Sequence, residues 1–473
     1  MLKVVLINPP TFRMIKPCVP GIVNDPESSG HYPPVGLLYI AAMAETVPGC
    51  EVRVLDAAAE HLDYARIESY LRHEAPDIVG IQAMTYTLID SLETARTAKK
   101  VNPRVHVCIG GPHVSIYPEE TLAFPEVDSV AIGEGEYIFA DLLKAVLAGA
   151  DLSGVTGLMY KKDGKALSAG PRGFIENIDA LPFPARHLLP LERYWSILFR
   201  SRSVTTMISS RGCPYQCIFC ERPHLGKKFR FRSAENVVGE LSRAVESGIK
   251  GFVFYDDTFT VNRQRVYDIC DGILEKKLDI DWSIRARVDT VDEKMLKKLR
   301  TAGCRTINFG VESGNPEILK VLRKDIDLKQ VQNAFLWCKR LGIRTLGYFM
   351  LGNPQESRQQ VLETIDFAKR LNPDYINVSL TTPFPGTDLY QMGMDRGLFA
   401  SDYWKEFARH PDVNFIPRLW EERMSERELR DLLGYAYKNF YARPSIVLKQ
   451  LLAVKSFREL SRKCRMGIRL LFK

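Results

Sequence analysis

Apolar residues over the first 145 positions follow two alternating patterns. Short runs rich in β-branched residues predict strands, and segments whose apolar residues recur every three or four positions predict helices between them. The predicted strands are residues 3–8, 51–57, 77–82, 105–110 and 128–133. The predicted helices are residues 35–46, 64–73, 89–101 and 137–147. This alternation predicts an α/β fold with a doubly wound, Rossmann-like parallel sheet, because parallel strands need long crossover connections.

The same alternation returns after residue 203 and continues to about residue 389. Its predicted strands are residues 204–209, 251–256, 281–287, 306–311, 345–350 and 375–380. Six consecutive strand–helix units predict a partial TIM-like barrel, whose active face lies at the carboxyl ends of its strands.

Two other segments complete the chain. Residues 146–202 contain repeated prolines and an Asp163-Gly164 pair, which predict a linker with a small hairpin. Residues 390–473 have a mainly helical pattern. We therefore expect a sheet domain over residues 1–145, a linker over 146–202, a barrel over 203–389 and a helical C-terminal region over 390–473.

Glycine-rich loops follow two of the predicted strands of the first domain. They are Gly110-Gly111-Pro112-His113 and Gly133-Glu134-Gly135-Glu136. Glycine lets the backbone approach a ligand closely, and ligands of doubly wound sheets bind beyond the carboxyl ends of the strands. The dinucleotide-binding pattern G-x-G-x-x-G is absent, because Ile138 stands where its third glycine would be. The sequence therefore argues against a simple nicotinamide-binding domain.

Three of the ten cysteines form a C-x3-C-x2-C pattern just after the first predicted barrel strand. They are Cys213, Cys217 and Cys220. Closely spaced thiolates suit zinc or an iron–sulfur cluster. Structural zinc needs a fourth ligand, for which His224 is the nearest candidate. A 4Fe-4S cluster on three cysteines keeps one iron open, as a catalytic site requires, so the spacing favours the cluster.

With the aromatic Phe219 before the last cysteine, this motif resembles that of the radical S-adenosylmethionine (SAM) superfamily. The resemblance implies that Cys213, Cys217 and Cys220 hold a 4Fe-4S cluster whose open iron binds SAM, and that Phe219 lies beside this cofactor. It also implies an external one-electron reductant of the flavodoxin or ferredoxin type, which drives SAM cleavage to a 5′-deoxyadenosyl radical. The cofactor supplies the chemistry, and the protein orients it and excludes water.

Further barrel segments resemble SAM-binding motifs of this superfamily. The resemblance implies that Asp256 and Asp257 meet the methionine end of SAM, that Glu312 and Ser313 contact its ribose, and that Gly352 lies on the adenine side. The acidic residues of both segments could instead cap helices.

Two arginines, Arg285 and Arg287, alternate on the third predicted barrel strand and should share one face. A buried arginine needs an anionic partner. For Arg287 this partner is either a SAM carboxylate or an internal carboxylate, and the sequence leaves both open.

The first domain resembles the cobalamin-binding branch of the superfamily, which includes cobalamin-dependent methylases and the anaerobic porphyrin-ring cyclase. Residues 33–37 and 77–80 and the two glycine-rich loops carry the likeness. It implies that cobalamin contacts a set of loop residues. They are Gly110, Gly111, His113, Gly133 and Glu134. No histidine has the D-x-H-x-x-G context of a cobalt ligand, so we expect His113 to be a loop residue near the cofactor tail.

The resemblance implies an oxygen-sensitive enzyme that methylates an unactivated carbon of a small-molecule, lipid or tetrapyrrole substrate. Three alternatives stay open: cobalamin-dependent cyclisation or oxidation, a non-catalytic cofactor-based sensor, and a methylthiotransferase. The last would need a second cluster on Cys18, Cys50 and Cys108.

The net charge of +8 arises almost entirely from residues 445–473, where eight basic residues face one acidic residue. Apolar residues at helical spacing make this tail amphipathic. It either packs on the barrel or docks peripherally on an anionic membrane surface, and we consider nucleic acid a poorer partner because no nucleic-acid module accompanies the charge. Because the sequence shows neither a signal peptide nor a long apolar segment, we expect a cytoplasmic protein.

Overall fold

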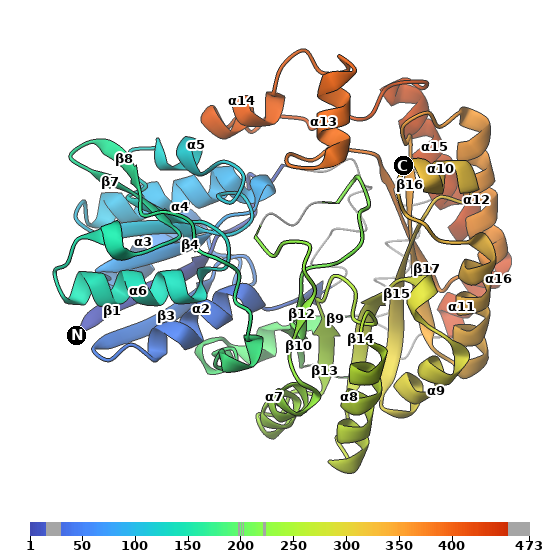
Figure 1. Cartoon of the computed structure of the whole chain (residues 1–473), viewed down its shortest axis with the longest axis horizontal. Helices are drawn as coiled ribbons and strands as arrows, with labels where there is room; N and C mark the ends of the chain where they lie inside the picture. Colours follow the sequence, from blue (N-terminus) through green and yellow to red (C-terminus); the bar gives the residue numbers. More distant parts are fainter. Residues whose placement is uncertain (16–29, 197–198, 200, 202, 221–223, 453–473) are drawn as a thin grey trace.

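The computed structural model describes residues 1–473 except 16–29, 197–198, 200, 202, 221–223 and 453–473. Two units stand side by side in Figure 1, a sheet domain drawn in blue and teal and a barrel drawn in green to orange. The expected α/β architecture is confirmed in both units.

The first unit is built on a seven-stranded sheet in the order β3-β1-β4-β5-β6-β7-β8. Its strands are β1 (Leu2–Asn8), β3 (Cys50–Asp56), β4 (Ile78–Gln82), β5 (His106–Gly110), β6 (Ser129–Ala131), β7 (Leu158–Lys162) and β8 (Lys165–Ser168). The first five are parallel in a doubly wound order that reverses direction between β1 and β4, the point at which such sheets bind ligands. The predicted hairpin is present as β7 and β8, and it extends this sheet beyond residue 145.

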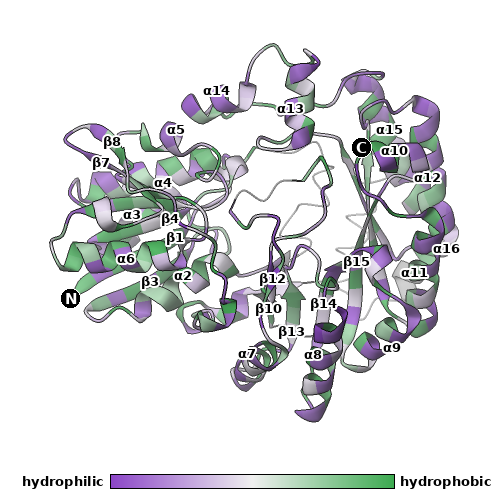
Figure 2. Cartoon of the chain, viewed as in Figure 1, coloured by the Kyte–Doolittle hydropathy of each residue, from purple (hydrophilic) through white to green (hydrophobic). Residues whose placement is uncertain are grey.

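Four main helices cover the two faces of this sheet. Helices α2 (Val35–Glu45) and α6 (Gly135–Leu147) share one hydrophobic core with it, and α3 (Tyr64–Glu74) and α4 (Leu88–Val101) share another. Hydrophobic residues concentrate on the strands between these layers (Figure 2). The sequence periodicity predicted α3, α4 and α6 because each buries one apolar face, whereas α2 is apolar and buried on most of its surface.

The second unit is a sheet of six parallel strands whose order follows the chain. The strands are β10 (Val204–Met207), β13 (Gly251–Phe254), β14 (Asp281–Ala286), β15 (Cys304–Glu312), β16 (Arg344–Leu351) and β17 (Tyr375–Leu380). Helices α7 (Ala234–Glu246), α8 (Arg263–Glu275), α9 (Glu293–Thr301), α11 (Leu328–Leu341) and α12 (Arg358–Leu371) cover its outer face, and the short α10 (Pro316–Val321) follows β15. The first and last strands do not pair, so the predicted partial barrel is confirmed.

Short two-stranded ladders lie beside the barrel. The ladder of β11 (Ser210–Arg211) and β12 (Arg230–Phe231) begins at the loop that follows β10. A second ladder pairs β2 (Gly30–His31) with β9 (Trp195–Ser196), and it joins the first unit to the linker.

The C-terminal region divides between the two units. Helices α13 (Asp388–Asp395) and α14 (Tyr403–Arg409) cross above both in Figure 1. Trp404 and Phe407 of α14 are buried in a core of the first unit, against α5 (Pro118–Leu122). Helix α15 (Glu426–Tyr441) instead packs on the barrel. The helical C-terminal region therefore joins the units rather than covering one of them.

Two tyrosines of α15 form hydrogen bonds with the unpaired edge of the last barrel strand, β17. The hydroxyl of Tyr437 accepts a hydrogen bond from the amide of Val378 at 2.9 Å and donates one to its carbonyl at 3.1 Å. Tyr441 does the same for Ile376. These contacts satisfy backbone groups that an edge strand leaves open.

Helix α16 (Pro444–Leu452) is the last element described. The predicted docking surface of the basic tail lies mostly in residues 453–473, outside the described residues, and it stays a prediction. Within the described part of the chain, no helix is long and apolar enough to cross a membrane.

Replacing Trp404 by alanine should destabilise the first unit by about 3–5 kcal/mol, because its buried ring leaves a cavity. The indole also donates a hydrogen bond to Pro383 O at 2.9 Å and packs against Phe415 at 5.0 Å between ring centroids. Chemical denaturation measures the effect. Replacing the exposed Tyr435 by alanine is the control, and it should change the denaturation midpoint little. Equal midpoints for the two variants would contradict the docking of α14 on the first unit.

Candidate active site at the junction of the two units

Cys213, Cys217 and Cys220 lie in one loop beyond the carboxyl end of β10. Gly212 precedes them with a φ of +76°, and a Cβ at this position would lie 2.2 Å from the carbonyl oxygen of Lys228. Only glycine fits such a position. The path of the backbone into the first cysteine is therefore fixed by steric contact.

The thiols lie beside hydroxyl and cationic groups. Cys213 Sγ is 3.8 Å from Thr258 Oγ1, and Cys217 Sγ is 3.9 Å from a guanidinium nitrogen of Arg287. Burial raises the pKa of the Cys217 thiol, whereas Lys324 and Arg287 lower it. Within the described residues, no three cysteine, histidine or carboxylate side chains converge closely enough to form a ready-made metal site. The loop thus carries three soft donors, and two cations lie near one of them, Cys217.

Asp256 holds the start of this loop. Its carboxylate accepts hydrogen bonds from the amide and hydroxyl of Ser209 at 2.7 and 2.6 Å and from the hydroxyl of Ser210 at 2.5 Å. Arg265 lies 3.7 Å away. The side chain predicted to meet SAM is therefore engaged with the protein, and it positions the cysteine loop. Asp257 follows it, half-buried, and its contact with SAM stays a prediction.

Two further residues predicted to bind SAM form internal ion pairs. Glu312 has a φ of 67° at the end of β15 and lies 2.9 Å from Lys324 Nζ. Arg287 donates two hydrogen bonds to the carboxylate of Asp289, each at 3.0 Å, and stacks on Tyr215 with 3.8 Å to the ring centroid. Of the two partners that the sequence left open for Arg287, the structure has the internal carboxylate.

Phe219 and Ser313 are packed into the protein. Phe219 lies against a small apolar cluster that includes Ile218 and Trp420. The hydroxyl of Ser313 is buried and shares a 3.0 Å hydrogen bond with Thr364. Phe219 thus anchors the cysteine loop, and Ser313 joins the end of β15 to α12.

Gly352 begins a tight turn after β16, with a φ of +77°. Its amide and that of Asn353 both donate to one carboxylate oxygen of Glu356 at 2.8 Å. The other oxygen of Glu356 is buried without a hydrogen-bond partner, and burial raises the pKa of this carboxyl to about 7. Hydrogen bonds to the buried carboxyl group of Glu356 therefore hold the turn that was predicted to face adenine.

The glycine-rich loops of the first unit lie at the carboxyl edge of its sheet. Gly111 has a φ of +114°, and a Cβ there would lie 2.7 Å from Ala83 O. Gly133 has a φ of +90°, but a Cβ there would meet nothing within 4 Å. The backbone next to Gly110, at the end of β5, is thus closely packed, whereas at the end of β6 it faces open space.

His113 is wholly buried behind this edge. Its Nδ1 lies 3.1 Å from the hydroxyl of Thr85, and its Nε2 is buried without a hydrogen-bond partner. Burial lowers the pKa of this histidine to about 3, so the ring is neutral at physiological pH.

Glu134 differs from the expectation of a cobalamin contact, because its carboxylate is used in ion pairs with the barrel. One oxygen lies 2.7 Å from Arg211, and the other lies 2.7 Å from Arg230 and 2.6 Å from the amide of Ile175. Glu136 pairs with Arg211 as well. All four charged side chains are buried, and Arg211 stands two residues before the first cysteine. The sheet edge and the cysteine loop are therefore joined by one buried charge network.

Comparison with known proteins agrees with this arrangement. Residues 207–368 match the radical SAM superfamily, and residues 24–143 match the B12 binding domain. An uncharacterized methyltransferase of Pyrococcus horikoshii is 37% identical over 95% of both chains. The chain belongs to the cobalamin-binding radical SAM family. It is an enzyme, and the cofactors of its family are a 4Fe-4S cluster, SAM and cobalamin.

A second relative is the anaerobic magnesium-protoporphyrin IX monomethyl ester cyclase of Rubrivivax gelatinosus, 30% identical over 88% of this chain and 75% of the cyclase. Among solved structures, the radical SAM methyltransferase TsrM from Kitasatospora setae, with cobalamin and a [4Fe-4S] cluster bound, superposes with a TM-score of 0.75. It is 18% identical over 99% of both chains, a likeness that shows the fold.

The residues of this radical SAM enzyme fit its cofactors. Cys213, Cys217 and Cys220 offer the three thiols that a cluster with one open iron needs, and the nearby cations would offset thiolate charge. At the edge of the cobalamin-binding sheet, Gly133 leaves the backbone accessible and His113 offers a buried, unpartnered nitrogen. The donor chemistry and the open glycine edge therefore both suit the groups that the family implies.

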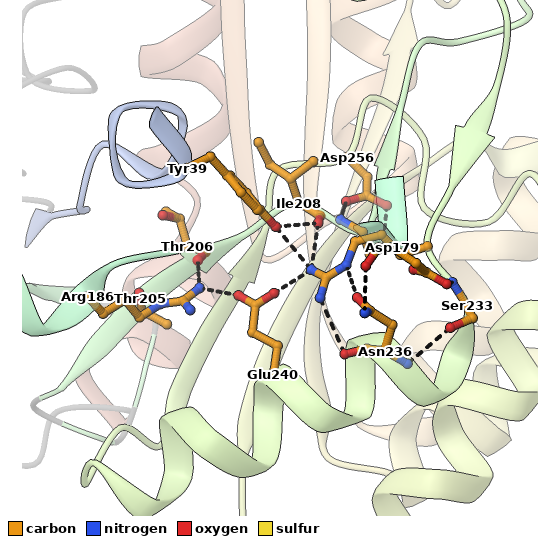
Figure 3. Close-up of polar contacts among 12 residues, drawn as sticks. Tyr39, Asp179, Arg186, Thr205, Thr206, Ile208, Ser233, Asn236, Glu240 and Asp256 are labelled. Carbon is orange, nitrogen blue, oxygen red and sulfur yellow. Dashed lines mark hydrogen bonds and ion pairs between the residues drawn. The ribbon is translucent and has the colours of Figure 1, made fainter. Parts of the chain in front are cut away.

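A second buried network ties the radical SAM barrel to the cobalamin-binding sheet (Figure 3). Glu240 of α7 pairs with Arg232 and, at 2.5 Å, with Arg186 of the linker. Arg232 also donates to the hydroxyl of Tyr39 on α2 at 3.1 Å and to Ile208 O at 3.1 Å. Sheet domain, linker and barrel thus meet around one buried carboxylate.

The sequence analysis missed the arginines of these networks. Arg211 and Arg230 stand in the strand pair that flanks the cysteine loop, and the only local signal was a basic residue beside the cluster motif. Their partner Glu134 is 77 residues from Arg211 and 96 from Arg230 along the chain. No spacing rule connects residues so far apart.

The structure argues against the methylthiotransferase alternative. Cys50 begins β3 and Cys108 lies within β5, with β1 and β4 between them. Three strand spacings amount to about 14 Å, too far for two ligands of one cluster. Burial also raises the pKa of Cys108 to about 11, as expected of an inert thiol. Cys18 lies outside the described residues.

Replacing Glu134 by glutamine should lower the free energy of unfolding by about 3 kcal/mol, because Arg230 is left buried without its carboxylate. The cysteine loop should also hold iron less tightly. Denaturation midpoints and iron content after anaerobic reconstitution measure both effects.

Glu176→Gln is the matched control. Glu176 pairs with Lys228 at 2.7 Å on the surface, where both side chains are about two-thirds exposed. Its loss should cost at most about 1 kcal/mol. If the two variants unfold at the same midpoint and keep the same iron content, the buried network does not hold the loop.

Proposed function

We propose that this enzyme methylates an unactivated carbon of a small-molecule, lipid or tetrapyrrole substrate. One observation carries the proposal: Glu134 connects the sheet edge at Gly133 to Arg211 of the cysteine loop. The cobalamin edge and the cluster loop thus border one junction. The methyltransferase relative, at 37% identity, supports the same reaction class.

When bound, the cofactors supply one-electron cleavage of SAM and a transferable methyl group. The protein contributes position and charge. Asp256 and Gly212 fix the cysteine loop, Lys324 and Arg287 place positive charge beside its thiols, and Glu134 holds the loop against the sheet. The electron comes from an external reductant, which we propose to be of the flavodoxin or ferredoxin type.

Cobalamin-dependent cyclisation is the second candidate function. It is favoured by the cyclase relative, which is 30% identical over 88% of this chain. The two reactions differ in their products, because methylation adds a carbon from SAM and cyclisation does not.

The cofactor assignment is tested by anaerobic reconstitution with iron, sulfide and hydroxocobalamin. Wild type should contain one 4Fe-4S cluster and one corrin per chain and release 5′-deoxyadenosine from SAM under reducing conditions. Cys217→Ala should lose the cluster and this release, yet retain the corrin, because cobalamin is assigned to the other unit. A wild type without corrin would contradict the assignment of cobalamin to the first unit. Two clusters per chain would favour the methylthiotransferase alternative.

The reaction class is tested with SAM labelled in its methyl group with ¹³C. The reconstituted enzyme is incubated with an anaerobic extract of small molecules and analysed by mass spectrometry. Label in a new product, absent with Cys217→Ala, is the expected result. A new product without label would favour cyclisation or oxidation. If 5′-deoxyadenosine never forms, the sensor hypothesis gains support.

A further inference from the structure

The inner face of the barrel carries polar side chains on β14, β15 and β16. On β14, Trp282, Ile284 and Ala286 belong to the core beneath the helices, so Arg285 points into the barrel interior. Its backbone partner on β15 is Asn308. The inward positions of β16 are likewise only half-buried, in alternation with buried ones. The interior is therefore not closed by packing.

Arg285 has no anionic partner among the described residues. Its guanidinium makes no ion pair and no hydrogen bond there, and it lies over the ring of Tyr255, 4.8 Å from the centroid. By contrast, each buried arginine of the described chain pairs with a carboxylate. They are Arg186, Arg211, Arg230, Arg232, Arg265 and Arg287. A carboxylate therefore neutralises each of these six buried guanidinium groups, whereas the half-buried, inward-facing Arg285 has none in the described part of the chain.

The neighbours of Arg285 are neutral and polar. The side-chain oxygen of Asn308 is buried without a hydrogen-bond partner. Tyr348 on β16 lies close enough that Arg285 lowers the pKa of its phenol, although burial raises that pKa overall. Tyr32 of the first unit meets Tyr255 edge-on, with 6.3 Å between ring centroids. The guanidinium and the phenol hydroxyls can donate hydrogen bonds to a carboxylate or phosphate, whereas the Asn308 oxygen can only accept one.

The position of Arg285 separates it from the cysteine loop. Arg287, two residues further on, lies 3.9 Å from Cys217 Sγ, and both Arg287 and Lys324 already pair with carboxylates. Arg285 stands two residues before Arg287, within β14 rather than beyond its carboxyl end.

We propose that Arg285, with the hydroxyl of Tyr348, binds an anionic group of the substrate, a carboxylate or a phosphate, inside the barrel. This inference rests on the proposed function, because it takes the barrel interior as the substrate chamber. The carboxylate of SAM is the other source of the same chemistry, and the test separates the two.

The test uses the reconstituted holoenzyme and two matched probes, glutarate and its neutral diamide glutaramide. Saturation-transfer NMR measures their binding, and equilibrium dialysis measures that of SAM. Wild type should bind glutarate and not glutaramide. Arg285→Gln should weaken glutarate binding by about tenfold or more and leave the affinity for SAM unchanged, whereas Arg285→Lys should retain part of the binding.

Arg305→Gln is the control, because Arg305 lies on the same barrel sheet but pairs with Asp281 at 3.0 Å. It should bind glutarate as wild type does. Unchanged glutarate binding by Arg285→Gln, or no binding by wild type, would overturn the proposal. A tenfold loss of SAM affinity in Arg285→Gln would instead assign the guanidinium to SAM. The binding of both probes is measured without turnover. The result would therefore hold even if the enzyme transferred no methyl group.

Discussion

The buried carboxylate of Glu134 is the contact on which the arrangement of the active site depends. It lies between Arg211 and Arg230, and it satisfies a third donor on Ile175. Charges taken out of water are tolerated only when they are paired. Neither unit could bury its share of these charges alone, because separation would leave two arginines or two glutamates without partners. The network thus fixes the cysteine loop against the edge of the cobalamin-binding sheet.

Two other connections make the junction rigid. Glu240, Arg232 and Tyr39 join the barrel to α2, and α14 returns to bury Trp404 in the first unit. These contacts come from the linker, the barrel and the C-terminal region, so every segment of the chain takes part. Rigidity of this kind matters for radical chemistry, because reacting groups must be held in place and shielded from water.

The sequence predicted the helices and strands well, but it did not predict which distant side chains pair with each other. Strand and helix positions were readable because each element buries one face, which leaves a local periodicity. The cysteine motif was readable because its ligands are close together in the chain. The role of Glu134 was not, since its partners lie 77 and 96 residues away. For Asp256 and Arg287, sequence alone could not tell a ligand contact from an internal hydrogen bond or ion pair. Only the structure shows that the guanidinium of Arg285, inside the barrel, lacks a carboxylate partner among the described residues.

The central claim is that two cofactor-binding units form one rigid active site. Pulsed electron paramagnetic resonance tests it most directly, because the reduced cluster and cob(II)alamin each carry an unpaired electron. We expect the reconstituted wild type to give a single narrow distribution of distances between them. A broad distribution, or no measurable coupling, would mean that the units move independently and would contradict the account.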